Sequence, residues 1–416
     1  MQTDFDVLIV GGGLVGASLA CALRGSGLKI GIVEATSLGA STQPSYDDRT
    51  LALAYGSRRI FDGMGLWPAI AQHGVTPIRR IHISDRGRFG FTRLDANDAG
   101  LEALGYVVAN RALGAALYTA LADQSAIALI CPATVGSVIL DSEAARVQVR
   151  AGDAEYSLTA RLLVAADGAN SPVRDAVGIE AHRINYEQTA VVTTVTPERA
   201  HGYTAYERFT DSGPLALLPV GADSCAVVWS VRSDAVDTVM GWGDATFGAR
   251  LQEAFGERLG RFMRVGKRQV YTLPLTRVTE HVRPRLALIG NAAHTVHPVA
   301  GQGFNLGLRD VAALSQVLLD GVTAGRDIGD VTVLQRYADW RARDNRRVAG
   351  FTHSLIRIFS NDYFPLALAR NIGLLAVDLL PPLKRRLIRM TSGISGRLPR
   401  LACGLPLRTP TSHDPT

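Results

Sequence analysis

Two glycine-rich loops lie about 275 residues apart and constrain the fold of this chain more than any other feature. The first loop, Gly11 to Gly16, follows the apolar run 7–10, and the second spans Gly290 to Gly307. One such loop after a buried strand is common in proteins. Two loops near opposite ends of a chain indicate that a single long ligand is held at both of its ends.

The first loop has the pattern G-x-G-x-x-G and lies between a predicted strand and a predicted helix. In a dinucleotide-binding unit, Gly11 allows the tight turn, Gly13 lets the backbone approach a pyrophosphate and Gly16 lets the helix pack on the strand. The next predicted strand ends at Glu34, where an acid can accept hydrogen bonds from ribose hydroxyls. These residues predict a ligand with an ADP half, either NAD or FAD. The alternative is a glycine-rich turn without a ligand.

The second loop follows an apolar strand predicted at 286–290 and leads into a helix predicted to start near Phe304. The free N–H groups and positive dipole at this helix start suit an electron-rich group, such as the edge of a reduced flavin. Asn291, at the end of the strand, could bond a ribityl or phosphate oxygen. Another apolar strand ends at Asp167, which would contact the cofactor or fix the loops beside it; the alternative is a tight turn and helix start. The second loop favours FAD over a nicotinamide cofactor.

The chain is predicted to be an α/β protein with a discontinuous, Rossmann-like FAD-binding domain. Alternating strands at 181–275 indicate an inserted antiparallel sheet that forms a substrate domain. A chain of 416 residues is long for a single domain. The predicted parts are an FAD-binding domain at 1–75, 101–180 and 276–345, a substrate domain at 76–100 and 181–275, a C-terminal helical region at 346–408 and a disordered tail at 409–416.

Local patterns in the first third of the chain predict further elements. A helix is predicted over 47–63, and Arg49 near its start could reach a phosphate or a ring edge. The run 81–87 alternates and ends in Asp-Arg-Gly, which predicts a hairpin. Arg111 precedes an apolar stretch that predicts a helix.

Several classes of protein are disfavoured by what the sequence lacks. The four cysteines form no C-x-x-C pair, which disfavours zinc and disulfide frameworks. His294 and His297 are three apart, but no acid or third histidine lies at ligand spacing, so no metal is expected. No G-x-S-x-G motif indicates a serine hydrolase, and no basic run interleaved with aromatics indicates nucleic-acid binding. Neither a signal peptide nor a membrane-spanning segment is expected.

Basic charge is concentrated near the C-terminal end of the chain. Residues 341–400 contain 12 Lys or Arg and three Asp or Glu, in a chain whose net charge is +6. Apolar stretches at 364–370 and 379–389 accompany this charge. Basic and apolar residues at helical spacing predict a region that lies on an anionic membrane surface. The alternative is a helical pair that covers the core and has a solvated basic face.

The motifs together resemble the class A flavoprotein monooxygenases, and within them the ubiquinone-biosynthesis hydroxylases. The resemblance covers nearly the whole chain and is most specific in the second loop. Its motifs are Asp48-Arg49, Ile81 to Gly87, Glu207 to Thr210, Gly213 to Ala216, Gly266 to Arg268 and Gly290 to Asp310. The resemblance implies an FAD-binding domain of the glutathione-reductase and p-hydroxybenzoate-hydroxylase type.

The resemblance also implies roles for single residues. Pro298 matches a proline whose backbone carbonyl faces the substrate, and His297 precedes it, so both are expected at the catalytic centre. The family has Gly-Asp where this chain has Gly290-Asn291, and we expect the missing charge to change FAD binding modestly. The residues expected to hold FAD are Gly11, Gly13, Gly16, Glu34, Arg49, Arg111, Asp167, Gly290, Asn291, Gly301, Gln302, Gly303 and Asn305.

The reaction follows from the same resemblance. NAD(P)H would reduce FAD in a transient visit, O2 would add to the reduced flavin, and a flavin C4a-hydroperoxide would hydroxylate a polyprenylated methoxyphenol of ubiquinone biosynthesis. The enzyme is expected in the cytoplasm, peripherally on the inner face of the membrane, and in a complex with other proteins of that pathway. Three alternatives stay open: another ring position, a soluble aromatic substrate, and a lipid-binding scaffold without catalysis.

Overall fold

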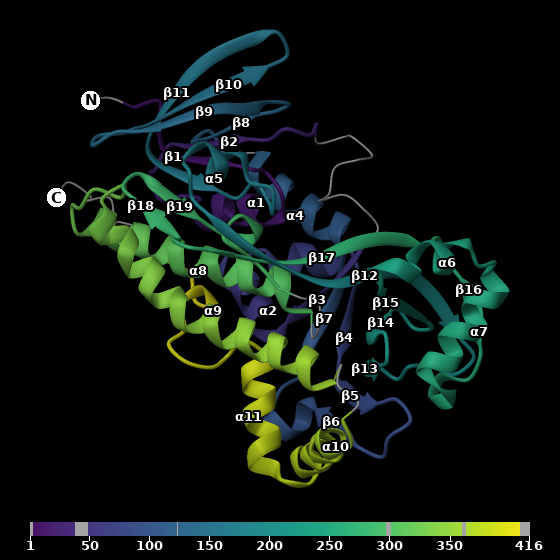
Figure 1. Cartoon of the computed structure of the whole chain (residues 1–416). Coiled ribbons are helices and arrows are strands. Elements are labelled where there is room, and N and C mark those ends of the chain that lie inside the picture. The colour runs from purple at the N-terminus through teal and green to yellow at the C-terminus, as the bar shows by residue number, and fades with distance from the viewer. Residues whose placement is uncertain (1–2, 38–48, 123, 297–300, 360–362, 408–416) are drawn as a thin grey trace.

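Two large sheets and a set of C-terminal helices make up the protein (Figure 1). The computed structural model describes residues 3–37, 49–122, 124–296, 301–359 and 363–407. The first sheet carries both glycine loops, the second sheet lies beside it, and the long C-terminal helices run beneath the first sheet toward the second (Figure 1).

The first sheet is built around parallel strands whose paired central residues are buried and mostly apolar, as in buried parallel sheets. β1 (Phe5–Val10) pairs in parallel with β11 (Ala154–Ala165) and β2 (Ile30–Val33). β19 (Leu286–Leu288) pairs in parallel with β11, and β8 (Ile127–Ile130) pairs with β2. The parallel strand predicted before the second glycine loop is therefore confirmed. Its position brings that loop to the same edge of the sheet as the first loop.

Successive residues of β1 point to opposite faces of this sheet. Val7 and Ile9 are buried in one hydrophobic core, and Leu8 and Val10 in another. The helices that contribute to the first of these cores are α1 (Leu14–Ala22), α2 (Tyr55–Gly63), α3 (Trp67–Gln72), α4 (Asn110–Ala122), α8 (Gln302–Thr323) and α9 (Val331–Phe359).

The outer part of β11 continues into an antiparallel arm at the top of the molecule (Figure 1). β10 (Ala145–Ala151) pairs with β11 on one side and with β9 (Thr134–Leu140) on the other. At the far edge of the sheet, β18 (Val282–Arg283) pairs with β19.

The antiparallel sheet predicted at 181–275 is confirmed, and it also recruits strands from elsewhere in the chain. β5 (Arg80–Asp85) and β6 (Phe91–Asp95) form the predicted hairpin, and β5 joins the sheet by parallel pairing with β13 (Thr204–Thr210). Two helices that the sequence analysis does not predict, α6 (Val236–Gly241) and α7 (Asp244–Phe255), lie at the far end of this sheet. In spatial order the strands are β20 (His294–Thr295), β17 (Gln269–Val278), β12 (Ala181–Pro197), β15 (Ser224–Arg232), β14 (Gly213–Val220), β13 (Thr204–Thr210), β5 (Arg80–Asp85) and β6 (Phe91–Asp95), with β16 (Phe262–Val265) paired to β12.

A small third sheet occupies part of the segment predicted to be a helix at 47–63. β3 (Thr50–Ala54) pairs with β7 (Gly105–Ala109), which also pairs with β4 (Val75–Ile78). Only the second half of the segment, α2, is helical. The prediction was wrong at Thr50–Ala54 because pairing with a distant strand overrides the helical propensity of its Leu and Ala residues.

The C-terminal part is helical, but its first helix begins before the expected boundary. α9 runs without a break across the boundary placed between residues 345 and 346. α10 (Phe364–Leu379) packs on β6, and α11 (Pro381–Thr391) packs on the turn that follows β6. The chain then returns to the first core, where Leu401 is buried. The tail predicted to be disordered at 409–416 lies outside the described residues.

Candidate active site

One continuous cavity of about 1560 Å³ lies between the two large sheets and the C-terminal helices. Both glycine loops line one end, and apolar residues of α9, α10 and α11 line the other. Pockets for small molecules measure roughly 300–1000 Å³. The cavity is therefore large enough for a long cofactor with a second molecule beside it.

The first glycine loop has the geometry of a dinucleotide site. Gly11 has a φ of +99°, and a Cβ added there would lie 2.5 Å from the carbonyl oxygen of Ala166. A Cβ on Gly16 would lie 1.9 Å from the carbonyl oxygen of Gly11, so only glycine permits this contact between helix and loop. A Cβ on Gly13 would meet no atom within 4 Å, although Gly13 lines the cavity. Gly11 and Gly16 thus allow packing, whereas Gly13 leaves room for a phosphate.

Glu34 lies beside this loop at the end of β2, where its side chain is buried. Its Oε2 accepts a hydrogen bond from the backbone N–H of Gly12 at 2.6 Å, and its Oε1 accepts one from the backbone N–H of Thr36 at 2.8 Å. Each carboxylate oxygen has a second lone pair. The carboxylate is fixed in place and still able to accept bonds from a pair of ribose hydroxyls.

Asp167 follows β11 on the same edge of the sheet and holds the start of α5 (Pro172–Ala176). Its Oδ2 accepts a hydrogen bond from the backbone N–H of Val173 at 3.1 Å. Its Oδ1 is buried and accepts no hydrogen bond from the described residues. Burial raises the pKa of this carboxyl. A buried acceptor without a donor is costly, so a ligand hydroxyl at this point of the cavity fits the geometry.

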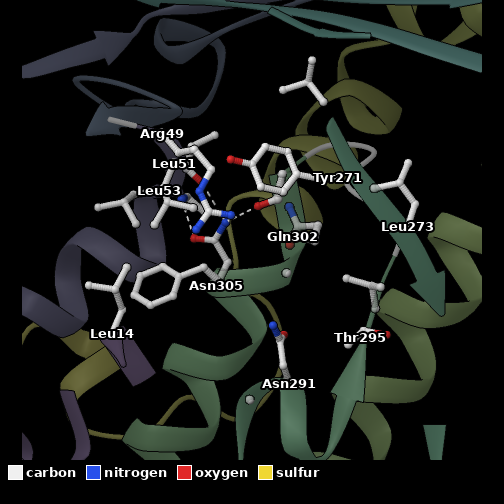
Figure 2. A pocket seen from close by; sticks show the side chains of 18 of the residues that line it. Leu14, Arg49, Leu51, Leu53, Tyr271, Leu273, Asn291, Thr295, Gln302 and Asn305 are labelled. Atoms are coloured by element: carbon white, nitrogen blue, oxygen red, sulfur yellow. Dashed lines mark hydrogen bonds between the residues drawn. The ribbon is translucent and has the colours of Figure 1, made fainter. Parts of the chain in front are cut away.

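The second loop presents an uncapped helix N-terminus to the cavity. Gly301 precedes α8 in the left-handed conformation (φ +60°) and supplies no side-chain cap. A Cβ on Gly303 would meet nothing within 4 Å, and both glycines line the cavity. Gly290 also has a positive φ, of +59°, and Asn291 beside it points into the cavity (Figure 2). Among the described residues no side chain caps α8, and its first turn lies where it would face an electron-rich ring edge.

The side chains of Asn305 and Gln302 hold the loop and its neighbours in place. The Asn305 amide donates to the carbonyl oxygens of Ala52 and Gly301, at 2.8 and 2.6 Å. Its Oδ1 accepts bonds from the backbone N–H of Ala54 and from the hydroxyl of Ser57. With both ends of the amide engaged, Asn305 serves to fix β3 against α8, and the cradle for a ring is provided by backbone atoms.

Arg49 lies in the cavity, whereas Arg111 does not. The Arg49 guanidinium lies over the ring of Tyr271, 4.7 Å from its centroid, and both residues line the cavity across from Asn291 (Figure 2). Arg111 is exposed at the start of α4, and its neighbour Asn110 lines the cavity instead. The structure therefore does not bring Arg111 together with the other residues expected to hold the cofactor.

The residues expected at the catalytic centre, His297 and Pro298, lie outside the described residues. Thr295 and Gly301, on either side of that segment, both line the cavity. Within the described part of the chain, no group of three or more His, Cys, Asp or Glu side chains is arranged to hold a metal ion.

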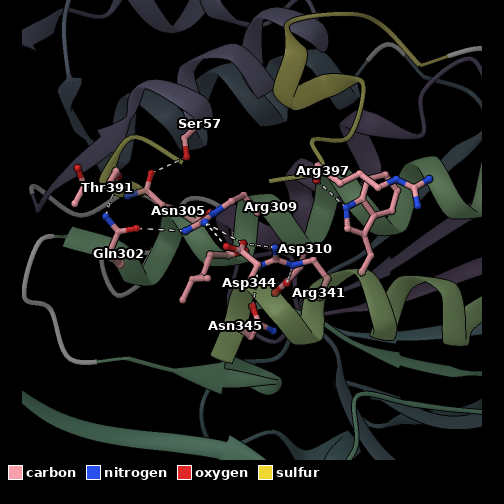
Figure 3. A network of polar contacts seen from close by, with 12 residues as sticks. Ser57, Gln302, Asn305, Arg309, Asp310, Arg341, Asp344, Asn345, Thr391 and Arg397 are labelled. Atoms are coloured by element: carbon pink, nitrogen blue, oxygen red, sulfur yellow. Dashed lines mark hydrogen bonds and ion pairs between the residues drawn. The ribbon is translucent and has the colours of Figure 1, made fainter. Parts of the chain in front are cut away.

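A buried polar network ties the second loop to α9 (Figure 3). Asp310 is fully buried and accepts a hydrogen bond from Arg341 Nε at 2.7 Å. Its other oxygen lies 2.7 Å from His294 Nε2 and accepts a bond from the backbone N–H of Gly290 at 3.0 Å. Burial alone would raise the pKa of Asp310, but His294 and Arg341 hold it well below its usual range.

The network continues from Arg341 to the first residue of α8. Asp344 forms ion pairs with both Arg341 and Arg309. Arg309 in turn donates to the side-chain oxygen of Gln302 at 3.3 Å. The end of β19 and the start of α8 are thereby fixed to one another through α9. These residues could not be found from the sequence, because charges spaced along two separate helices give no local pattern.

The half of the cavity away from the glycine loops is mainly apolar. The individual residues that line it were not predicted from the sequence. Phe209 from β13 stacks on Phe359 from α9, with ring centroids 3.7 Å apart. The apolar residues that line this half include Ile81, Ile83, Leu94, Leu218, Phe351, Leu355, Ile358, Leu374, Val377 and Leu387. They come from the second sheet and from all three C-terminal helices.

These features define a flavoprotein with room for an apolar partner beside its cofactor. The fixed carboxylate at Glu34, the open space over Gly13, the unpartnered oxygen of Asp167 and the uncapped start of α8 follow one another along a single cavity. They fit the ribose, pyrophosphate, ribityl and ring portions of FAD. When bound, FAD supplies the redox chemistry, because it accepts electrons from a nicotinamide donor and activates O2.

Comparison with known proteins agrees with this assignment. A family model described as an FAD binding domain matches residues 4–352. The ubiquinone hydroxylase UbiL of Rhodospirillum rubrum is 39% identical over 405 residues, which cover 97% of this chain and 93% of that protein. The 3-demethoxyubiquinol 3-hydroxylase of Escherichia coli is 32% identical over 394 residues, covering 94% and 98%. The human ubiquinone biosynthesis monooxygenase COQ6 is 33% identical over 444 residues, covering 94% and 93%.

Solved structures share the fold. The p-nitrophenol 4-monooxygenase PnpA of Pseudomonas putida superposes with a TM-score of 0.77 at 19% identity, over 95% of this chain and 100% of that one. PqsL of Pseudomonas aeruginosa, a probable FAD-dependent monooxygenase, gives 0.74 at 21% identity, over 89% and 99%. The chain belongs to the family of FAD-dependent monooxygenases that contains the ubiquinone-biosynthesis hydroxylases.

Proposed function

We propose that this monooxygenase hydroxylates the aromatic ring of a polyprenylated methoxyphenol in ubiquinone biosynthesis, such as 2-octaprenyl-6-methoxyphenol. The observation that carries the proposal is the single cavity, which joins the cofactor end to a long apolar end. A ring held where the two halves meet would have its tail among the side chains of the C-terminal helices. The names of the relatives, which act on ubiquinone precursors, support the same substrate class.

The residues of this chain would bind and orient the reactants. The start of α8 would stabilise negative charge on the reduced ring, and the apolar walls around Phe209 and Phe359 would keep water from the reacting atoms. Glu207 of the second sheet lines the cavity, and its carboxylate would be an acceptor within reach of a polar group on the substrate ring. NAD(P)H and O2 would be the other two reactants.

A soluble aromatic acid is less well supported as a substrate. Such an acid would need a cationic anchor at the far end of the cavity. The arginine that lines that end is Arg370, and it is already paired with Asp85 at 2.8 Å. Hydroxylation of another position of the same prenylated ring is the stronger alternative, since a 3-demethoxyubiquinol 3-hydroxylase is among the relatives.

The test is the profile of quinone-pathway lipids, by mass spectrometry, in the source organism with and without this gene. Accumulation of a prenylated methoxyphenol, with loss of ubiquinone, is the expected result. Accumulation of a different intermediate would move the reaction to another ring position. An unchanged profile, together with FAD-dependent turnover of small phenols by the purified enzyme, would refute the lipid substrate.

The same purification tests whether the chain is a scaffold without catalysis. We expect a yellow protein that oxidises NADH or NADPH faster when the prenylated phenol is present. A colourless protein that takes up no added FAD would contradict the proposal.

We also propose that the enzyme acts in the cytoplasm together with other proteins of the pathway, which co-purification from the source organism would test.

A further inference from the structure

α10 is the helix at the base of the molecule (Figure 1), and exposed apolar side chains form a stripe along it. Phe364, Leu368, Ile372 and Leu379 are 67%, 41%, 55% and 73% exposed. Their spacing of four, four and seven residues places them on one face of the helix. Exposed apolar groups scattered singly are ordinary, but a contiguous stripe marks a surface that another phase or molecule covers.

The charged residues of α10 do not share this face. Arg370 is buried and paired with Asp85 in β5, with Nε 2.8 Å from the carboxylate. Asp378 accepts a hydrogen bond from the backbone N–H of Arg93 in β6 at 2.8 Å. Both side chains therefore anchor α10 to the second sheet and leave its outer face without charge.

α11 adds positive charge at the end of this stripe. It follows α10 after a bend of 96°. Ile388 is buried in a small core with Leu94, whereas Arg385, Arg386 and Arg389 of α11 are exposed. Helices that lie in the plane of a membrane interface combine an apolar face with Lys or Arg in this way. No single described helix is long and apolar enough to cross a membrane, and α10 with α11 meets that criterion only as a bent pair.

The inner side of the same two helices lines the cavity. Leu374 and Val377 of α10 and Leu387 of α11 are lining residues. Gly373 is both exposed and a lining residue, and a Cβ there would meet no atom within 4 Å. Gly373 thus marks an opening of the cavity beside the apolar stripe.

We propose that α10 and α11 form the docking surface for an anionic lipid bilayer, and that a lipid tail enters the cavity from the bilayer past Gly373. The route of the tail rests on the proposed function, whereas the docking surface does not. A second copy of the chain is a poorer occupant of this surface. The exposed arginines beside the stripe match an anionic surface, whereas a second copy would bring no negative charge of α10 or α11 to meet them, since Asp378 is bonded to Arg93.

Flotation of the purified FAD-loaded enzyme with lipid vesicles tests the docking surface without any turnover. We expect binding to vesicles of phosphatidylcholine mixed with phosphatidylglycerol, and weaker binding to phosphatidylcholine alone. The variant Ile372→Asp/Leu379→Asp should lose the binding. Ile139→Asp and Met263→Asp are matched controls, because these side chains are 60% and 58% exposed on other elements, and both should bind like the parent. Each of Arg385→Gln and Arg386→Gln should weaken binding to the anionic vesicles roughly fivefold.

Unchanged vesicle binding by the double variant would overturn the docking surface. A second result would also overturn it: the parent enzyme binds neither kind of vesicle, is a dimer in solution, and becomes a monomer in the double variant. The stripe would then be an interface between copies. Point variants are preferable to truncation, since Leu401 beyond α11 belongs to the first core.

Turnover tests the opening. Gly373→Phe should raise KM for a long-tailed prenylphenol at least tenfold in vesicles and leave a short-tailed analogue unaffected. An equal effect on both substrates would overturn the route past Gly373. If no prenylphenol is hydroxylated by the parent enzyme, the proposed function fails, and vesicle binding by the parent and its loss in the double variant still decide the docking surface.

Discussion

Replacing Asp310 should weaken the fold and the flavin site together. Asp310 is fully buried and accepts bonds from Arg341, His294 and the backbone N–H of Gly290. Removing one partner of a buried ion pair costs about 3–5 kcal/mol. Arg341 keeps a second partner in Asp344. We therefore expect Asp310→Asn to lower the free energy of unfolding by about 3 kcal/mol, the lower limit of that range.

The assay is urea unfolding, followed through the fluorescence of bound FAD. With an m-value of about 3 kcal/mol/M, a loss of about 3 kcal/mol lowers the midpoint by about 1 M. The exposed Asp234, paired with Arg232 on the surface, is the matched control. Asp234→Asn should leave the midpoint unchanged, because exposed pairs contribute little.

The pH dependence provides an independent check. The pKa of Asp310 is lower in the folded protein than its ordinary value, so its contribution is present above that ordinary value and is lost as the pH falls through the folded pKa. The gap between parent and Asp310→Asn should be largest at neutral pH and close in acid. A parent-like midpoint for Asp310→Asn at neutral pH, or a gap that widens in acid, would refute the reasoning.

Three further predictions concern the cofactor site and the acid limit of stability. Gly13→Leu should fold with a parent-like circular dichroism spectrum but take up no FAD, whereas Gly11→Ala should fail to fold because its Cβ would meet Ala166; equal behaviour of the two variants would be inconsistent with their different surroundings. Asp167→Ala should weaken FAD binding about tenfold in a fluorescence titration, since it removes an acceptor for a ligand hydroxyl, and an unchanged Kd would show that no such bond forms. Burial, with the nearby charge of His294, lowers the pKa of His281 to about 4, so the stability it contributes above its ordinary pKa of 6.5 is lost as the pH falls toward 4. His281→Gln should therefore make the unfolding midpoint depend less on pH over that range, and a parent-like pH dependence would contradict this.

Features with local causes could be predicted from the sequence. The parallel strands β1 and β19 were predictable because each is a short apolar run before a glycine loop, and the hairpin of β5 and β6 because alternation precedes Asp-Arg-Gly. The motif predicts that glycine is required at Gly11 and Gly16. The structure gives the reason, because a Cβ at either position would collide with a backbone carbonyl oxygen.

The prediction was wrong where a distant contact decides the local structure. Thr50–Ala54 has residues typical of a helix, and it is a strand because β7 and Asn305 pair with its backbone. The cofactor role of Arg111 rests on the resemblance and stays a prediction; in the structure Arg111 is exposed at the start of α4, whereas Asn110 beside it lines the cavity. Neither outcome leaves a trace in the neighbouring sequence.

By itself, the sequence determined the two glycine loops, the order of strands and helices around them, and hence the family and its cofactor. Only the tertiary structure decided which side chains meet: Asp310 with Arg341, Asp85 with Arg370 across 285 residues, and the apolar stripe of α10 outside the wall of the cavity. The physical reason is the range of the forces involved. Backbone geometry and hydrophobic periodicity act within a few residues, whereas ion pairing and burial depend on which distant surfaces the fold brings into contact.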